Sequence, residues 1–233
     1  MKYRNKILGI IPARKGSKGI KLKNIKNFNG KPLIFHTINV AKKSKLIDNL
    51  IVSTDSKDNA KIAEKYGIDA PFLRPKKYSN DKSSDFELIR HALSFYNKKN
   101  INYDAVILLR PTTVFKKVKY IDESIKYFFK NKFDSLRSIS NSRYSPYLMY
   151  KIKNKNIIPL FNKKFNSMRR QDLPESFQPN GLFEIISSKN IFEKKLMYGP
   201  NTGFYKVENE EVLLDIDTEL DFLIAQFVKK IIN

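Results

Sequence analysis

The sequence predicts an α/β protein with a doubly wound, mostly parallel sheet. Short apolar runs rich in Ile, Val and Leu alternate with longer amphipathic segments through the first 140 residues. Strands that alternate with crossover helices are typical of parallel sheets covered by helices on both faces. The length of 233 residues and a hydrophobic content of 41% suit one compact domain with a sizeable core.

Each element of the first half has its own local signal. The apolar runs predict strands at 7–13, 50–54, 70–73, 105–109 and 134–139. Amphipathic spacing predicts helices at 32–43, 56–66, 85–98 and 118–130. Pro32 lies near the first turn of its helix and Gly67 closes the second, as helix starts and stops commonly do.

The regular alternation ends after Ser140. Residues 145–160 read as a hairpin with its turn at 153–156, and a polar stretch follows up to 178. Further strands are expected at 182–187, 205–207 and 212–216, before a closing helix at 221–232. The segment around 141–180 is polar yet rich in aromatic residues, so we expect it to pack against a partner subunit. The chain is therefore interpreted as a single domain over 1–233 with an inserted dimerisation lobe at about 141–180.

The most informative segment follows the first strand. Residues 11–24 (IPARKGSKGIKLKN) carry five cationic side chains and two glycines in a loop. Glycines allow the backbone to approach a ligand closely, and amides and lysines then face an anion. The spacing differs from the phosphate loop and from the dinucleotide fingerprint. A polyphosphate site is favoured here, and a solvated basic turn is the alternative.

Carboxylates gather near the other end of the chain, in residues 214–221 (LDIDTELD). Alternation along an extended segment puts Asp215 and Asp217 on one face, where two carboxylates repel unless a cation lies between them. Magnesium is commonly held by one or two carboxylates together with substrate phosphates. The alternative is that Thr218 or Asp217 caps the last helix, with Glu219 nearby.

Composition narrows the function class. The formal net charge is +22, but the lysines are spread over the whole length and no nucleic-acid-binding motif is present, so nucleic acid is not the expected partner. The chain contains no cysteine, no apolar run of membrane-spanning length and no signal peptide pattern. We expect a cytoplasmic protein without membrane association. His36 and His91 lie in amphipathic helices and are expected to be structural.

Six motifs occur in order along nearly the whole chain. They are residues 11–24, 51–56 (IVSTDS), 73–75 with 79–84 (LRP and SNDKSS), 108–113 (LLRPTT), 169–181 (RRQDLPESFQPNG) and 214–222 (LDIDTELDF). This ordered set resembles the CMP-sugar synthetases, in particular the N-acylneuraminate cytidylyltransferases. The resemblance implies a doubly wound nucleotide-binding sheet and a lobe that completes the neighbouring subunit's site in a homodimer. It implies an enzyme that transfers CMP from CTP to an acidic 2-keto-3-deoxy sugar, releasing pyrophosphate.

The resemblance also assigns roles to residues on the nucleotide side. Triphosphate contacts are implied for Arg14, Ser17, Lys18, Lys23 and Asn24, and cytosine recognition for Arg74, Ser83 and Ser84. Asp215 and Asp217 would hold Mg²⁺, and Arg14, Lys23 and Asp217 would be the catalytic set. Fixed cations and amides are what a nucleotidyl-transfer transition state requires. Arg74 before Pro75 is alternatively an ordinary strand exit.

On the sugar side the resemblance implies contacts from Arg110, Thr112, Arg170, Asn180 and Glu184. Arg110 follows a central strand, where open α/β sheets place their ligands, although residues 110–113 could simply end a strand and start a helix. Arg170 would reach into the partner subunit, and surface charge is its alternative role.

Two positions depart from the sialic-acid enzymes, which typically carry Gln where this chain has Arg110 and Tyr where it has Glu184. We therefore expect an acceptor other than ordinary N-acetylneuraminate, such as a nonulosonate of the legionaminic or pseudaminic type, or another acidic sugar. Two rival functions remain: a nucleotidyltransferase of the same fold that uses another NTP or acceptor, and a non-catalytic nucleotide-binding or nucleic-acid-binding protein.

Overall fold

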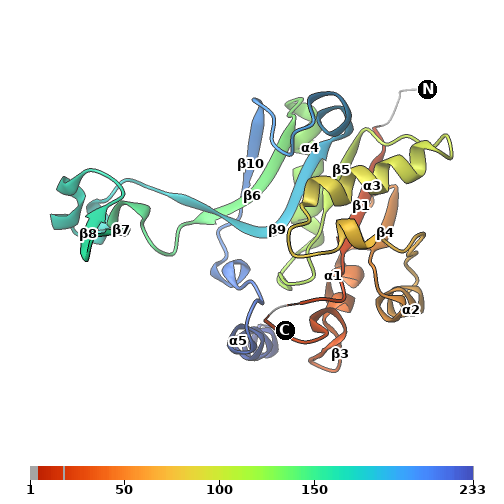
Figure 1. The fold of residues 1–233 in the computed structure, drawn as a ribbon, viewed down its shortest axis with the longest axis horizontal. Helices are drawn as coiled ribbons and strands as arrows, with labels where there is room; N and C mark the ends of the chain where they lie inside the picture. Colours follow the sequence, from red (N-terminus) through yellow and green to blue (C-terminus); the bar gives the residue numbers. More distant parts are fainter. Residues whose placement is uncertain (1–4, 18, 233) are drawn as a thin grey trace.

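A six-stranded sheet forms the middle layer of the protein in the computed structural model, which describes residues 5–17 and 19–232 (Figure 1). Its strand order is β10-β6-β9-β5-β1-β4. The strands are β1 (Ile7–Pro12), β4 (Asn49–Ser53), β5 (Ala105–Leu108), β6 (Ser135–Asn141), β9 (Phe177–Ser187) and β10 (Thr202–Lys206). In this sheet β9 runs against the common direction of the others, between β5 and β6. The prediction of a mostly parallel sheet is confirmed.

Helices cover both faces of this sheet. They are α1 (Leu33–Ala41), α2 (Lys57–Lys65), α3 (Asp85–Asn97), α4 (Val118–Lys130) and α5 (Glu219–Ile231). Side chains of α1, α2, α4 and α5 join one core cluster, and those of α3 join a second. Along β5 the side chains alternate between the clusters, with Ile107 in the first and Leu108 in the second. Both faces of the central strands are thus buried, as their continuous apolar runs predicted. Among the described residues, no helix is long and apolar enough to cross a bilayer.

The strand predicted at 70–73 is wrong as an element. The structure has only two isolated bridges there, between Ile51 and Asp69 and between Thr54 and Leu73. Pro71 interrupts this stretch and has no N–H to donate, so a continuous ladder along β4 cannot form.

The strand predicted at 212–216 is also wrong. Glu210–Leu213 instead forms a 3-10 turn, and the N–H of Leu214 donates to the carbonyl of Glu211 at 3.1 Å. Residues 214–217 then run without pairing as a strand. Two acidic residues in the first turn, after Asn209, favour the helical turn over a strand.

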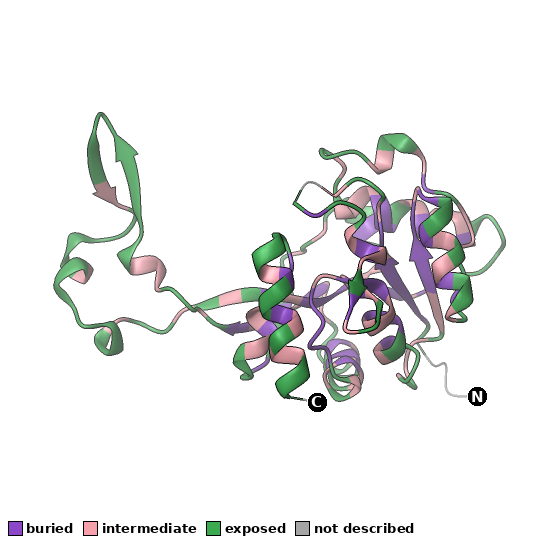
Figure 2. Ribbon diagram, turned by 90° about the horizontal axis from the view of Figure 1, so that it is seen from below, coloured by how far each residue is buried: buried purple, intermediate pink, exposed green. Residues whose placement is uncertain are grey.

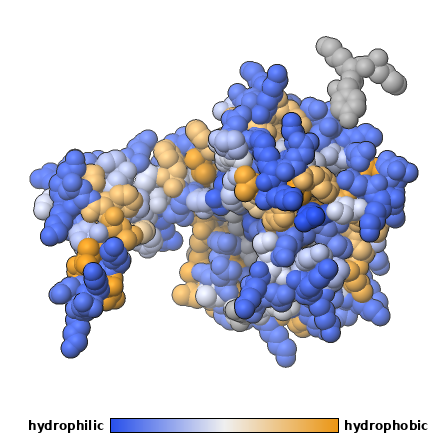
Figure 3. Space-filling view, turned by 45° about the horizontal axis from the view of Figure 1, so that its top comes forward, coloured by the Kyte–Doolittle hydropathy of each residue, from blue (hydrophilic) through white to orange (hydrophobic). Residues whose placement is uncertain are grey.

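An arm leaves the body between β6 and β9 (Figure 1). It carries the predicted hairpin, formed by β7 (Tyr150–Lys153) and β8 (Asn156–Pro159), with Asn154 and Lys155 at positive φ in a two-residue turn. Most of the arm is exposed (Figure 2), and apolar side chains gather on it (Figure 3). Ile152 is 82% exposed and Ile157 is 66% exposed. A second small hairpin, β2 (Asn27–Phe28) with β3 (Lys31–Pro32), lies before α1.

The chain is held firmly where it leaves β1. The carbonyl oxygen of Ala13 accepts hydrogen bonds from Thr54 Oγ1 at 2.5 Å and from Asn59 Nδ2 at 2.7 Å. All three residues are buried. Since the basic loop starts at the next residue, Arg14, these two bonds fix the point from which the loop begins.

Replacing Asn59 with Ala should therefore destabilise the protein. The change leaves the buried carbonyl of Ala13 with one donor, and the loss of such a bond costs about 1–3 kcal/mol of unfolding free energy. Urea unfolding followed by circular dichroism measures it. Lys61→Ala, at an exposed position of the same helix, is the matched control. Equal stabilities of the two variants would contradict this role of Asn59.

Candidate active site

A cavity of about 460 Å³ lies where β1 and β5 end. Its walls come from the loop after β1, residues 74–88, the loop after β5 and the segment before α5. The predicted site residues that line it are Arg14, Ser17, Lys23, Asn24, Arg74, Ser83, Ser84, Arg110, Thr112 and Asp217. Lys18 lies outside the described residues. Four segments that are far apart in the sequence thus meet at the carboxyl edge of the sheet, as the parallel topology requires.

The loop after β1 brings to the cavity a cation, Arg14, and a side chain that stabilises the loop, Asn24. Arg14 Nη1 lies 2.7 Å from Asp81 Oδ1, which comes from the segment that faces the loop. Asn24 is buried, and its Nδ2 donates to the carbonyl of Arg14 at 3.0 Å. The carboxylate of Asp55 accepts from the backbone N–H of Lys15 at 2.8 Å. Asn24 therefore shapes the loop as well as lining the cavity.

Lys23 joins the basic loop to the acidic segment near the other end of the chain. Its Nζ donates to the carbonyl of Ile216 at 2.6 Å and lies 3.1 Å from Asp217 Oδ1. The Lys23 side chain is only 12% exposed. A lysine held in this way keeps its charge at one fixed place at the cavity wall.

The two predicted metal ligands flank a buried residue. Ile216 is fully buried and its N–H donates to the carbonyl of Thr112 at 3.1 Å, whereas Asp215 and Asp217 are exposed. Asp217 lines the cavity, and Asp215 lies close to Gly181 of β9. No group of three or more metal-ligating side chains occurs within 5–17 and 19–232. Two hard carboxylates suit Mg²⁺ when phosphate oxygens complete its shell, so the donor set fits this metal.

The alternative role considered for the acidic segment is also present. Thr218 caps α5, and its Oγ1 accepts from the N–H of Asp221 at 3.2 Å. Asp221 completes the capping box, and Glu219 instead pairs with Lys26. The capping residues and the predicted metal ligands are thus different residues of one segment.

The segment predicted to read the base forms one wall. Arg74 is 6% exposed, and its Nε donates to Ser79 Oγ at 3.1 Å. Burial lowers the pKa of Arg74, while the carboxylates of Asp55 and Asp85 oppose that shift. Ser83 Oγ donates to a loop carbonyl, and Ser84 caps α3 in a capping box with Glu87. Both serines therefore have structural roles at the cavity wall.

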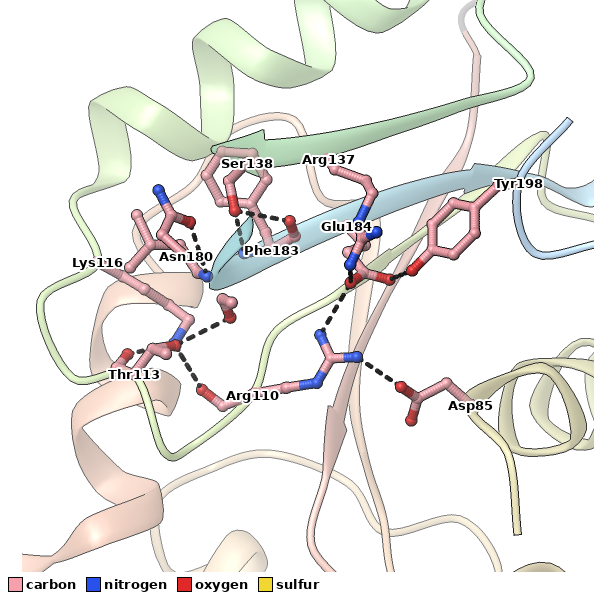
Figure 4. Close-up of polar contacts among 12 residues, drawn as sticks. Asp85, Arg110, Thr113, Lys116, Arg137, Ser138, Asn180, Phe183, Glu184 and Tyr198 are labelled. Atoms are coloured by element: carbon pink, nitrogen blue, oxygen red, sulfur yellow. Dashed lines mark hydrogen bonds and ion pairs between the residues drawn. The ribbon is translucent and has the colours of Figure 1, made fainter. Parts of the chain in front are cut away.

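The two departures on the sugar side contact each other. Arg110 Nη1 lies 3.4 Å from Glu184 Oε1, and Arg110 Nη2 lies 2.5 Å from Asp85 Oδ2 (Figure 4). Burial alone would lower the pKa of Arg110, but Asp85 and Glu184 outweigh it and raise the pKa. Glu184 is only 5% exposed and does not line the cavity. It lies behind Arg110.

Lys116 is a buried cation beneath the loop after β5 (Figure 4). Its Nζ donates to the carbonyls of Arg110 and Thr113 and to Thr113 Oγ1. Burial lowers the pKa of Lys116 well below its usual value, and the nearby carboxylate of Asp215 opposes that shift. These bonds hold the loop that presents Arg110 and Thr112.

Two predicted sugar contacts lie away from the cavity. Asn180 is buried beside an irregularity in the pairing of β6 with β9, where its Nδ2 donates to Ser140 Oγ at 3.0 Å and its Oδ1 accepts from the N–H of Leu182. Arg170 lies on the arm, and its Nη2 donates to the carbonyl of Arg143 at 2.8 Å. Neither is in the wall of the main cavity.

Neither His36 nor His91 lines the cavity. His36 Nε2 lies 2.9 Å from the carbonyl of Phe28, and burial lowers the pKa of its ring. His91 packs edge-on against Phe72. Both contacts are structural, as expected.

Sequence reasoning missed the acidic partners in the cavity wall, Asp81 and Asp85. Asp81 lies inside a motif that was recognised, and Asp85 starts a helix that was predicted. Their charge in a basic chain was the available signal. The sequence could not show that Asp81 would face Arg14 and Asp85 would face Arg110.

Comparison with known proteins identifies the family. Residues 8–224 match the family model described as cytidylyltransferase. The chain belongs to the cytidylyltransferase family.

Three curated relatives carry related names. The chain is 34% identical to the N-acylneuraminate cytidylyltransferase of Escherichia coli O18:K1:H7 over 95% of its own length and 52% of the relative's, so it spans about half of that protein. It is 31% identical to a pseudaminic acid cytidylyltransferase of Campylobacter jejuni, over 97% of both chains. It is 30% identical to a CMP-N,N'-diacetyllegionaminic acid synthase of Legionella pneumophila, over 95% of both.

The fold also has solved counterparts. A CMP:2-keto-3-deoxy-manno-octonic acid synthetase complexed with CTP superposes with a TM-score of 0.74, covering 98% of this chain and 100% of that one at 14% identity. A 4-diphosphocytidyl-2C-methyl-D-erythritol synthase from Anaerococcus prevotii gives 0.64, covering 97% and 96%, also at 14% identity. These likenesses establish the fold.

Replacing Gly19 with Ala should impair the site. A Cβ added there would lie 1.9 Å from the backbone oxygen of Asp217, so the loop and the acidic segment must separate. We expect kcat/KM for CTP to fall at least about tenfold, a cost of about 1.4 kcal/mol. Gly16→Ala is the matched control, because its Cβ would meet nothing within 4 Å. Pyrophosphate release measures both, and equal activities would contradict the close approach.

Proposed function

We propose that this chain transfers CMP from CTP to an acidic 2-keto-3-deoxy sugar of the sialic-acid type and releases pyrophosphate. One observation carries the proposal: a single cavity joins a basic loop, a buried arginine, the carboxylate of Asp217 and a second arginine. Its walls come from four of the six regions that the sequence motifs marked. Family membership and relatives named for three sugar acids of this kind support the same conclusion.

The reaction makes one bond and breaks another at the α-phosphate. The anomeric hydroxyl of the sugar attacks the α-phosphorus. The bond between that phosphorus and the oxygen that bridges the α- and β-phosphates breaks, and pyrophosphate leaves. Negative charge builds on the phosphate oxygens and on the leaving group. Arg14 and Lys23 would stabilise that charge. Fixed donors in a partly dry site do so without reorganisation.

Both cations already have carboxylate partners. Arg14 faces Asp81 and Lys23 faces Asp217. A triphosphate would compete with those carboxylates, since an oxyanion binds a cation in the same way. Asp215 and Asp217 would hold Mg²⁺, which would neutralise the phosphates and lower the pKa of the attacking hydroxyl.

The acceptor would lie next to Arg110 and Thr112, at the end of the cavity beyond β5. Arg110 is paired there with Asp85 and Glu184. A site built around this ionic contact favours a nonulosonate other than ordinary N-acetylneuraminate, in line with the departures at positions 110 and 184. Turnover on N-acetylneuraminate, pseudaminate and N,N'-diacetyllegionaminate distinguishes the candidates.

We also propose a homodimer in which the arm packs against the partner subunit. The exposed apolar residues of the arm support it, because such side chains commonly mark an interface. Arg170, on this arm, would then reach the partner's sugar site. A cytoplasmic location follows from the need for CTP.

Selective stabilisation by CTP is the expected result of a thermal-shift experiment with magnesium and each of CTP, UTP, GTP and ATP. Binding to the folded state raises its stability by mass action, by about 2.7 kcal/mol at 100 times Kd. Differential scanning fluorimetry measures it. A similar shift with every nucleotide would leave cytosine recognition by the Arg74 wall without support. It would favour a nucleotidyltransferase with another NTP, or a non-catalytic nucleotide-binding protein.

Asp217→Ala should abolish turnover while the protein stays folded. The change removes a carboxylate that lines the cavity and is 74% exposed at its side chain, so loss of stability should be small. We expect kcat to fall by at least about a hundredfold, or roughly 2.7 kcal/mol of barrier. Glu208→Ala removes an exposed carboxylate elsewhere and serves as control. Surviving pyrophosphate release in the Asp217 variant would refute the metal assignment.

A further inference from the structure

Arg110 is held on two sides by carboxylates that differ in exposure. Asp85 lines the cavity and its side chain is 38% exposed, whereas the Glu184 side chain is 6% exposed and lies outside the cavity wall. Arg110 itself lines the cavity at 25% exposure. The arginine is therefore the link between the cavity and a charge buried behind it.

The sheet determines where that buried charge lies. Glu184 of β9 stands opposite Leu108 of β5 and opposite Arg137 of β6. Because side chains alternate along a strand, Arg110 leaves the sheet on the same side as Leu108, two residues further on. The insertion of β9 between β5 and β6 thus brings one carboxylate between two arginines.

Both oxygens of Glu184 are used (Figure 4). Oε1 lies 3.4 Å from Arg110 Nη1 and 3.5 Å from Arg137 Nη2. Oε2 accepts a hydrogen bond from the Tyr198 hydroxyl at 2.9 Å. The Arg137 guanidinium lies over the Tyr198 ring at 4.5 Å. Burial and the Glu184 carboxylate raise the pKa of Tyr198 to about 12, so its hydroxyl keeps the proton it donates.

These contacts make a continuous chain from Asp85 through Arg110 and Glu184 to Arg137. A buried carboxylate without partners is strongly unfavourable, so Glu184 depends on the arginines. In return, a guanidinium bound at two of its nitrogens has little freedom to turn. Since Glu184 does not border the cavity, it can act on a ligand there only through Arg110.

We propose that Glu184, supported by Arg137 and Tyr198, is a positioning residue that fixes Arg110 for recognition of the sugar-acid acceptor. This inference rests on the proposed function. It replaces direct sugar contact by Glu184 with an indirect role, and it gives Arg137 and Tyr198 a part in acceptor selection. We expect the loss of Glu184 to leave CTP binding unchanged, because Glu184 does not line the cavity.

A double-mutant cycle tests the indirect role. We expect Glu184→Gln to raise KM for the best acceptor among N-acetylneuraminate, pseudaminate and N,N'-diacetyllegionaminate about tenfold, with KM for CTP unchanged. Arg110→Gln should raise it by at least as much. If Glu184 acts only through Arg110, the double variant will match Arg110→Gln alone. Effects that multiply would mean that Glu184 contacts the acceptor itself, and would overturn the proposal.

A smaller change keeps the inference testable if Glu184→Gln or Arg110→Gln prevents folding. Tyr198→Phe removes only the hydrogen bond to Glu184, and we expect a rise of about threefold in the same KM. Glu193→Gln is the control, since it disrupts an exposed pair with Lys189 at 3.8 Å. Thermal unfolding and the CTP-induced shift of each variant verify that the fold and the nucleotide side are intact.

The outcomes separate this inference from the function on which it rests. A wild-type protein that turns over none of the three acceptors overturns the proposed function and the inference with it. Wild-type turnover with an unchanged acceptor KM in Glu184→Gln overturns the inference alone. An equal rise of KM for CTP would also contradict it, because the network would then support the whole cavity.

Discussion

Lys23 joins the basic loop after β1 to the acidic segment before α5, and the shape of the cavity depends on this contact. Its Nζ bonds to the carbonyl of Ile216, 193 residues away, and faces the carboxylate of Asp217. Residues 214–217 have no strand partner, so isolated contacts place them: the bond from Lys23, the bond between Ile216 and Thr112, and the close approach of Gly19. Without these contacts the Asp217 carboxylate would not face the basic loop.

The elements that were predictable from sequence are those with a strong local signal. Continuous apolar runs form β1 and β5, and segments with helical apolar spacing form α3 and α4. In both cases the apolar side chains are the ones that become buried in the core. The two segments wrongly predicted as strands have apolar residues but make only isolated backbone contacts, not a continuous ladder. Pro71 interrupts one ladder, and the acidic turn after Asn209 diverts the other. Pairing is a property of the fold, which a local pattern cannot report.

The same distinction applies to the cavity. Arg14 and Arg110 follow β1 and β5, whose ends meet at one edge, so their convergence could be inferred from topology. Arg74 is placed at the same edge by an isolated bridge between Leu73 and Thr54, just after β4. The carboxylate partners of these arginines could not be inferred in this way. The contact between Arg110 and Glu184 exists because β9 runs antiparallel between β5 and β6, and Asn180 is drawn into the β6–β9 pairing by the same strand. A motif identifies residues that matter, but the register of a distant strand decides whether they meet a ligand or each other.

Charge in this protein works at two ranges. The formal net charge of +22 attracts polyanions from solution, and that attraction is weakly selective. In the cavity wall, three cationic side chains each have a carboxylate partner: Asp81 for Arg14, Asp217 for Lys23 and Asp85 for Arg110. A ligand must therefore match positions of fixed cations and displace fixed anions to bind well. If the chain has the proposed function, selectivity would follow from geometry, since only a triphosphate and a sugar acid of the right spacing would make the exchange favourable.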